Sequence, residues 1–178
     1  LEKVREKTEI PLVFLTYANP IFTYGREAFF TRCAKASIDG VIVPDVPFEE
    51  RATLLPFARE KGIALISLIA PTSHERVQML AREAEGYIYL VSSMGVTGVR
   101  EKITTDLKEI VEKIREVSNQ PVAVGFGIAR PEQAAQMADI SDGAIVGSAI
   151  VKLVAKYGKT AVGPVRDYVL SMVEAVRV

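Results

Sequence analysis

Six short apolar runs alternate with segments of helical periodicity from one end of the chain to the other, and few architectures accommodate such an alternation. The runs have the length and the β-branched content of strands that are buried on both faces of a parallel sheet. They are residues 10–17, 40–45, 63–70, 86–91, 121–126 and 143–147. Strands that alternate with helices indicate βαβ units, so the sequence predicts an α/β protein with helices packed outside a parallel sheet or barrel.

The segments between the runs have the period of amphipathic helices. In the clearest of them, residues 104–118, the apolar side chains fall on one helical face and charged side chains cover the other. The other helical segments are residues 25–37, 48–62, 73–84, 130–138, 148–158 and 163–176. No linker-like or low-complexity stretch interrupts this pattern, so residues 1–178 are expected to form a single domain.

The number of βα units indicates an incomplete barrel. A (β/α)8 barrel of the TIM-barrel type typically has about 250 residues, or about 30 for each of its eight units. This chain of 178 residues has room for about six. Residues 1–9 have the charged pattern of a helix end, and no strand-like run precedes them. We therefore expect the first two units to be absent and the chain to form the C-terminal three quarters of a (β/α)8 barrel.

Charge and cysteine content exclude several classes of function. The 22 basic and 22 acidic side chains balance, which gives no electrostatic reason to expect nucleic acid as a partner. The single cysteine, Cys33, cannot form an internal disulfide, and with the single histidine, His74, it cannot complete a structural zinc site. No apolar run approaches the roughly 18 residues of a membrane span. We expect a soluble, cytoplasmic protein without a metal, with Cys33 in the core and His74 exposed at a helix start.

Three of the strand-like runs lead into glycine-containing loops: SSMGVTG at residues 92–98, VGFGI at 124–128 and VGSAI at 146–150. Glycines let a phosphate oxygen approach backbone amides closely, and phosphate often lies at the loops after the last two strands of a (β/α)8 barrel. The hydroxyl of Ser148 is expected to cap the helix that follows Gly147, where the helix dipole favours an anion. The alternative is that these glycines only form tight βα turns. The patterns GxGxxG and GxxxxGKS/T are absent, which weighs against a dinucleotide or P-loop site.

The strand-end motifs, taken together, resemble those of the tryptophan synthase alpha-chain family. In the family's order they are LTYANPIF (15–22), VPDVPFEE (43–50), LIAPTS (68–73), YIYLVSSMGVTG (87–98), VGFGI (124–128) and DGAIVGSAIV (142–151). The resemblance implies a barrel lyase that cleaves indole-3-glycerol phosphate into indole and glyceraldehyde 3-phosphate, with no cofactor of its own. It also implies a partner, the tryptophan synthase beta chain, which condenses indole with serine by means of pyridoxal phosphate.

The resemblance assigns residues to three parts of a substrate site. The phosphate of a small phosphorylated substrate is expected at Gly98, Phe126, Gly127, Gly147 and Ser148. The indole ring is expected at Tyr17, Ile69, Tyr89 and Phe126, with Leu15 and Pro44 nearby. Core packing is the alternative explanation for each of these apolar side chains. Thr97 is expected in a mobile lid that closes over the site and excludes water.

This sequence departs from the family in the residues that supply the acid and the base of the reaction. Retro-aldol cleavage requires a group that protonates the indole ring and a base that takes the glycerol hydroxyl proton. In the family these are a glutamate and an aspartate within a stretch resembling ELGxPFSDPxADG, which these 178 residues do not contain. No catalytic residue is therefore assigned, and we expect negligible lyase activity from this chain alone.

Asp45 is an acidic residue with a rigid position at the expected carboxyl end of a strand, between two prolines. The resemblance places Asp45, Asn19 and Phe22 on the surface that exchanges signals with the beta chain. The alternative interpretation is that the Asp45 carboxylate only caps its loop.

Two other functions stay open. The first is a non-catalytic domain that binds a phosphate ligand or the beta chain. The second is another six-stranded α/β fold with an unrelated phosphate ligand, against which the ordered motifs weigh. If the first two units are absent, the first and last remaining strands have unpaired edges, so self-association through those edges is expected.

Overall fold

The computed structural model describes residues 1–71, 73–92, 100–125 and 127–176 and groups the chain into two compact units. Unit 1 comprises Leu1–Leu68 together with Glu83–Tyr87. Unit 2 comprises Ile69–Arg82 together with Ile88–Val178. The single domain expected over residues 1–178 stays a prediction, and each unit is described by itself.

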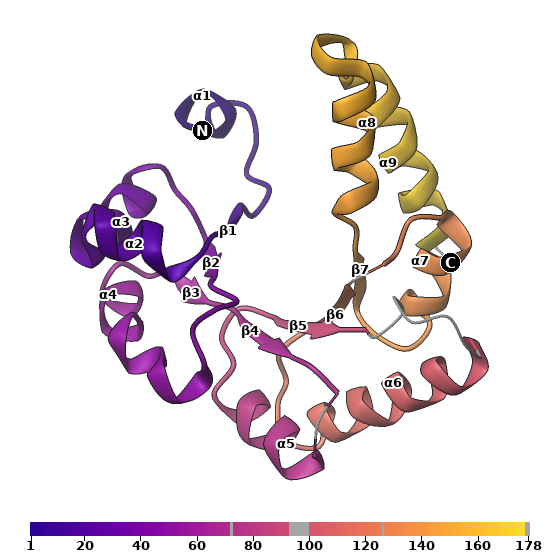
Figure 1. Cartoon of the computed structure of the whole chain (residues 1–178), viewed down its shortest axis with the longest axis horizontal. Coiled ribbons are helices and arrows are strands. Elements are labelled where there is room, and N and C mark those ends of the chain that lie inside the picture. The colour runs from indigo at the N-terminus through magenta and orange to yellow at the C-terminus, as the bar shows by residue number, and fades with distance from the viewer. Residues whose placement is uncertain (72, 93–99, 126, 177–178) are drawn as a thin grey trace. The chain divides into compact units, whose positions relative to one another are not determined.

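Unit 1 contains a parallel sheet in the order β1-β2-β3, with α2, α3 and α4 beside it (Figure 1). Its strands are β1 (Val13–Leu15), β2 (Gly40–Ile42) and β3 (Ala64–Leu65). Its helices are α1 (Glu2–Arg5), α2 (Ala18–Tyr24), α3 (Arg26–Lys35), the 3-10 helix η1 (Phe48–Thr53) and α4 (Leu55–Glu60). The apolar core of unit 1 includes Ile21, Phe30, Cys33, Val41, Leu54 and Ala58.

Cys33 is a core residue, as the sequence predicts, and its side chain is 3% exposed. Burial raises the pKa of the Cys33 thiol to about 11, because the charged thiolate is poorly solvated there. Cys33 is therefore a small apolar packing residue and not a reactive thiol.

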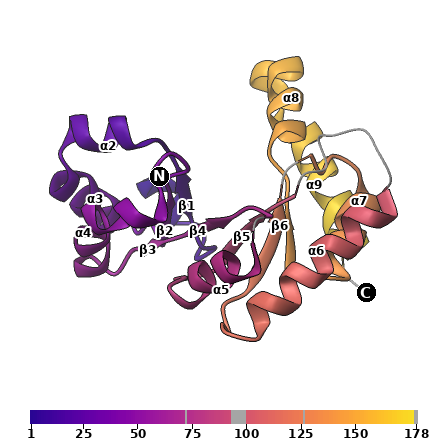
Figure 2. The same cartoon turned by 60° about the horizontal axis from the view of Figure 1, so that its bottom comes forward.

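Unit 2 contains most of a second sheet, in the order β4-β5-β6-β7, and the boundary between the units falls inside β4, after Leu68. The strands are β4 (Ser67–Ile69), β5 (Ile88–Val91), β6 (Val122–Gly125) and β7 (Gly143–Ile145). The helices are α5 (His74–Arg82), α6 (Arg100–Arg115), α7 (Pro131–Ala138), α8 (Ser148–Tyr157), the 3-10 helix η2 (Gly158–Thr160) and α9 (Val162–Val176). Helices α7 and α9 pack against each other, and α8 and α9 form a hairpin (Figures 1 and 2).

The predicted α/β class with parallel strands is confirmed, and every apolar run contains a strand. The expected number of six strands is wrong, because residues 63–70 form the two short strands β3 and β4. Between them, the N–H of Ile66 donates to the carbonyl oxygen of Val41 at 3.0 Å, and the chain then joins the second sheet. Among the described strands, neither sheet closes into a barrel.

The largest differences from the expected helices concern α2 and α6. Helix α2 was not among the helical segments expected from the sequence. Pro20 is the third residue of α2, and proline is tolerated in the first turn because its missing N–H would have no intrahelical acceptor there. Helix α6 begins at Arg100, four residues before the expected start at Thr104.

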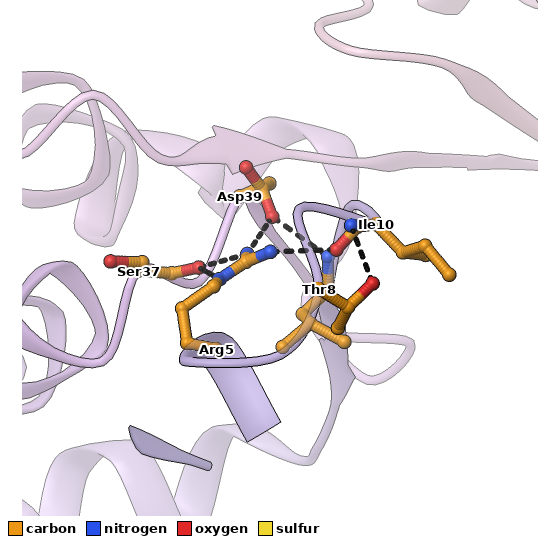
Figure 3. A network of polar contacts seen from close by, with 6 residues as sticks. Arg5, Thr8, Ile10, Ser37 and Asp39 are labelled. Carbon is orange, nitrogen blue, oxygen red and sulfur yellow. Dashed lines mark hydrogen bonds and ion pairs between the residues drawn. The ribbon is translucent and has the colours of Figure 1, made fainter. Parts of the chain in front are cut away.

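Arg5 ties α1 to the starts of β1 and β2 (Figure 3). Its guanidinium donates to the carbonyl oxygen of Ser37 through Nε at 3.0 Å and to that of Ile10 through Nη1 at 2.7 Å. Nη2 of Arg5 also donates to Oδ2 of Asp39 at 2.6 Å, and the same oxygen accepts the N–H of Leu12 at 2.7 Å. The Leu12 N–H and then Arg5 hold the pKa of the Asp39 carboxyl below its usual value.

Arg51 is a charged side chain in the interior of unit 1, where it is only 9% exposed. Its Nη2 donates to the carbonyl oxygen of Leu65 at 2.7 Å. Its Nη1 donates to Oγ of Ser67 at 3.0 Å and to the carbonyl oxygen of Glu83 at 3.3 Å. The ring of Phe48 lies 5.7 Å from its Cζ. Burial lowers the pKa of Arg51, so the hydrogen bonds must compensate for lost hydration.

The segment Glu83–Tyr87 belongs to unit 1 although the residues on either side of it belong to unit 2. Oε1 of Glu85 accepts a hydrogen bond from Nε of Arg59 at 2.6 Å. Gly86 has a φ of +68°, and a Cβ there would lie 2.9 Å from the side chain of Ile66. Backbone conformation and close packing both require glycine at this position.

We predict that Arg51→Met lowers the free energy of unfolding by about 3 kcal/mol, because buried acceptors lose a charged donor. Urea unfolding followed by circular dichroism measures the change. Arg59→Met is the matched control, since the Arg59–Glu85 ion pair is more than half exposed on the arginine side and should contribute less than about 1 kcal/mol. Equal losses for the two variants would contradict the role given to Arg51.

Candidate functional site

The carboxyl ends of β5, β6 and β7 lie at one edge of the second sheet. The parallel register pairs Val91 with Gly125 and Gly125 with Ile145, so the three strands end level with one another. Beyond that level, the N–H of Ser92 donates to the carbonyl oxygen of Gly125 at 2.8 Å. Ligands of α/β proteins bind outside the carboxyl ends of parallel strands, so this edge is the candidate site.

Tyr89 covers Gly125 at this edge. Tyr89 pairs with Ala123, and Gly125 is two residues further along β6, so the three positions face the same side of the sheet. A Cβ on Gly125 would lie only 2.6 Å from Cζ and 2.7 Å from Cε1 of the Tyr89 ring. The ring is half-buried, and this burial raises the pKa of its hydroxyl. Gly125 is therefore needed for close packing beneath an aromatic ring, not for a special backbone conformation.

Gly127 and Gly147 follow β6 and β7 at the same edge, and both are exposed. Gly127 has a φ of +78°, a conformation that favours glycine. Gly147 is the N-cap residue of α8, and a Cβ there would meet no atom within 4 Å. The expected capping role of the Ser148 hydroxyl is wrong, because Gly147 takes the cap position and Ser148 is the first helical residue. Among the residues that the structure describes, no side-chain hydrogen bond caps the start of α8, where the first N–H groups have no intrahelical acceptor.

Other expected site residues are distributed over the two units or lie outside the described residues. Ile69, at the end of β4 in unit 2, is fully buried. Tyr17 is the N-cap residue of α2 in unit 1 and is 58% exposed. The residues outside the described ranges are Thr97, Gly98 and Phe126.

Asp45 caps α2 in unit 1. The backbone N–H of Ala18, the first residue of α2, lies 3.0 Å from Oδ1 and 3.2 Å from Oδ2 of Asp45. This bond satisfies one of the N–H groups that have no acceptor within the helix. Asp45 therefore caps the start of a distant helix, where the sequence alternative was a cap of its own loop, and its role in signalling stays a prediction.

Two further expected surface residues lie on α2. Asn19 is exposed, and the Phe22 ring is 47% exposed. The guanidinium of Arg26 lies over this ring, with its Cζ 5.6 Å from the ring centroid. Arg26 was not singled out from the sequence, and spacing of four residues gives no signal here, because Gly25 separates the helix of Phe22 from that of Arg26.

His74 is the first residue of α5 and is 56% exposed, as the sequence predicts. Its Nε2 lies 3.5 Å from Oε1 of Glu109. Within residues 1–71, 73–92, 100–125 and 127–176, no cluster of three or more histidines, cysteines or carboxylates has an arrangement suited to a metal ion. In that part of the chain, no helix combines the length and the apolar character that crossing a membrane requires.

These features define an α/β protein of the (β/α)-barrel class whose candidate site lies at the carboxyl ends of its parallel strands. The family model for the tryptophan synthase alpha chain matches residues 1–175. The chain is 52% identical over 170 residues, 95% of its length, to the tryptophan synthase alpha chain of Lactiplantibacillus plantarum. It belongs to the tryptophan synthase alpha-chain family.

Solved structures agree with this assignment. The tryptophan synthase subunit alpha of Campylobacter jejuni is similar, with a TM-score of 0.84, 36% identity and coverage of 99% of this chain and 71% of that one. The tryptophan synthase a2b2 complex of Pyrococcus furiosus contains a similar chain, with a TM-score of 0.84, 27% identity and coverage of 97% and 70%. The chain spans 64% of the L. plantarum protein and 63% of that of Lacticaseibacillus casei, just under two thirds of their length.

We predict that Gly125→Ala lowers the free energy of unfolding by about 2 kcal/mol, because the new methyl group overlaps the Tyr89 ring. In a Tyr89→Ala background the same change should cost less than about 0.5 kcal/mol, since the overlap is gone. Urea unfolding of the four proteins in this cycle measures the coupling.

Gly143→Ala is the matched control for Gly125→Ala. Gly143 lies in the neighbouring strand β7, and a Cβ there would come no closer than 4.0 Å to the Cβ of Ala123. Its substitution should leave the unfolding free energy within about 0.5 kcal/mol of the wild type. If Gly125→Ala cost the same with and without the Tyr89 ring, the packing explanation would be wrong.

Proposed function

We propose that this chain supplies the phosphate-binding and indole-binding part of the lyase that cleaves indole-3-glycerol phosphate into indole and glyceraldehyde 3-phosphate in tryptophan biosynthesis. Its family membership supports the reaction. The observation that carries the proposal is the shared edge of β5, β6 and β7, where an aromatic ring, a glycine with positive φ and an uncapped helix start follow neighbouring strands.

The phosphate group is proposed to bind between Gly127 and the start of α8, at Gly147 and Ser148. Both glycines are exposed, and an uncapped helix N-terminus offers N–H groups and a favourable dipole to an anion. Gly98 and Phe126 are proposed to complete this phosphate site.

The indole ring is proposed to contact Tyr89, with Ile69, Tyr17 and Phe126 as further members of the pocket. Tyr89 offers a half-buried aromatic face at the edge of the sheet. Aromatic rings favour offset or edge-to-face contact with another ring system, which suits a flat indole. Thr97 is proposed to act in a lid that excludes water.

These 178 residues are proposed to have negligible lyase activity by themselves. The cleavage requires an acid and a base, and the sequence contains no counterpart of the family's catalytic stretch. Asp45 is a poor substitute, because both of its carboxylate oxygens are near the N–H of Ala18 that they cap. The chain alone is therefore expected to bind a phosphorylated ligand without turning it over.

A second candidate function is that of a non-catalytic chain that binds a phosphate ligand or a tryptophan synthase beta chain. It is supported by the exposure of Asn19, Phe22 and Asp45 on one part of unit 1. The similar Pyrococcus furiosus chain is part of an a2b2 complex. As an alternative to beta-chain binding, self-association is proposed through β1 and β7, each of which is one of the two outer strands of its sheet.

Indole release from indole-3-glycerol phosphate is the test of the proposed function. The sample is the 178-residue chain, with its 19.5 kDa mass confirmed, assayed with and without an added beta chain. We expect binding of glycerol 3-phosphate by calorimetry but no indole above the uncatalysed rate. Turnover that disappears in Asp45→Asn would show that the chemistry has been assigned to the wrong carboxylates.

We predict that Gly147→Asp abolishes measurable binding of glycerol 3-phosphate while leaving thermal stability unchanged or slightly raised. Aspartate is a favoured N-cap residue, and there is open space for its side chain at this position. Its carboxylate would occupy and repel the proposed phosphate position.

Gly163→Asp is the control, because it also adds a carboxylate in open space, near the start of α9 instead of α8. It should leave affinity for glycerol 3-phosphate unchanged. If Gly147→Asp leaves the affinity for glycerol 3-phosphate unchanged, the start of α8 is not part of the phosphate site.

A further inference from the structure

Arg26, at the start of α3, lies between two phenyl rings. Its Cζ is 5.6 Å from the ring centroid of Phe22 in α2 and 5.0 Å from that of Phe57 in α4. A guanidinium within about 6 Å of a ring centroid is attracted by the electron density of the ring face. Arg26 thus connects three helices of unit 1, α2, α3 and α4, which lie next to one another (Figure 1).

A third contact fixes the position of the Arg26 guanidinium. Its Nη1 donates to the carbonyl oxygen of Thr53, the last residue of η1, at 3.0 Å. Among the residues that the structure describes, Arg26 forms no ion pair with a carboxylate. Arg26 is half-buried, and the contacts that the structure describes for its guanidinium are with two rings and one carbonyl oxygen. The contacts of Arg26 therefore restrain the Phe22 and Phe57 rings and do not neutralise a carboxylate.

The backbone between Phe22 and Arg26 does not hold α2 in place by itself. Gly25 separates α2 from α3 and has a φ of +90°, so the two helices are not continuous. The start of α2 is held by Asp45 through the N–H of Ala18, and its last turn carries Phe22 against Arg26. Two side chains from elsewhere in unit 1 therefore anchor the two ends of this short helix.

We propose that Arg26 is a positioning residue that holds the exposed Phe22 ring in the orientation in which it docks on the beta chain. The inference rests on the docking surface of the proposed function and adds a residue to it. Phe22 is 47% exposed as a residue, and its ring contacts the guanidinium of Arg26. The exposed part of Phe22 is free to enter an apolar pocket of a partner. Fixing the ring beforehand lowers the entropy lost on binding.

The first test uses tryptophan fluorescence and can be made on this chain without a partner. The chain contains no tryptophan of its own, so an introduced one gives the only tryptophan signal. Phe22→Trp introduces a single indole whose fluorescence reports on this position alone. If Arg26 holds the ring, adding Arg26→Met should raise the acrylamide quenching constant of that indole by about two-fold, because the guanidinium no longer covers it. Arg32→Met is the control, since Arg32 lies on the same helix and pairs with Glu2 on the surface. Unchanged quenching in Arg26→Met overturns the proposal.

The second test measures binding of the 178-residue chain to a tryptophan synthase beta chain by surface plasmon resonance. Arg26→Met should weaken binding about five-fold, and Arg26→Lys, which keeps the charge but loses the planar group, should have an intermediate effect. In a Phe22→Ala background Arg26→Met should have no further effect, because Arg26 acts only through the ring. A general loss of structure would lower binding in both backgrounds, which overturns the positioning role.

The two proposals fail in distinguishable ways. If Phe22→Ala leaves beta-chain binding unchanged, the docking surface itself is wrong, whatever Arg26 does to the ring. If Phe22→Ala weakens binding but Arg26→Met does not, the docking surface stands and the positioning role of Arg26 is wrong. Phe57→Leu provides a second variant, because it keeps an apolar side chain in the core and removes only the second ring that holds the guanidinium.

Discussion

The register of three parallel strands is the constraint on which the candidate site depends. Val91, Gly125 and Ile145 stand side by side, so the loops after β5, β6 and β7 all begin at the same level. A shift of one residue in any strand would turn its side chains to the opposite face. It would also move Tyr89 away from Gly125, and with it the aromatic surface at this edge. The positions of the later glycines and of the start of α8 follow from the same alignment.

Three arginines of unit 1 share one role, because each donates hydrogen bonds to backbone carbonyl groups where loops meet strands and helices. Arg5 binds the carbonyl groups of residues before β1 and β2, Arg51 binds those of Leu65 and Glu83, and Arg26 binds that of Thr53. A guanidinium carries five donors in a fixed plane, so one side chain can satisfy acceptors from several segments at once. Short strands of two or three residues provide few ladder hydrogen bonds, and these arginines supply additional connections.

The sequence predicts those parts of the molecule that depend on local pattern. Every apolar run contains a strand, Cys33 is in the core, and the glycines after β6 and β7 lie at the expected strand ends. What could not be predicted depends on residues distant in the chain. Arg51 looks like a surface residue of an amphipathic helix, and its partners are 14 to 32 residues away.

The same reason applies at the candidate site. The capping of α2 by Asp45 bridges 27 residues, and the overlap between Tyr89 and Gly125 depends on strand pairing. The start of α8 at Ser148 was predicted correctly, but the capping role given to the Ser148 hydroxyl was wrong, because Gly147 takes the cap position. The family resemblance supplied the expected site residues, while the contacts around them became visible only in three dimensions.

The discontinuous composition of unit 1 has a consequence for how the protein is made. Ribosomes release the chain from its N-terminus, and domains generally fold as their residues emerge. Unit 1 cannot be completed when Leu68 emerges, because Glu83–Tyr87 contributes the carbonyl oxygen that Arg51 binds and the carboxylate that Arg59 binds. During synthesis the Arg51 guanidinium would lack the Glu83 carbonyl acceptor until α5 and the residues after it have also been made. Unit 1 is therefore expected to reach its final packing only after synthesis of unit 2 has begun.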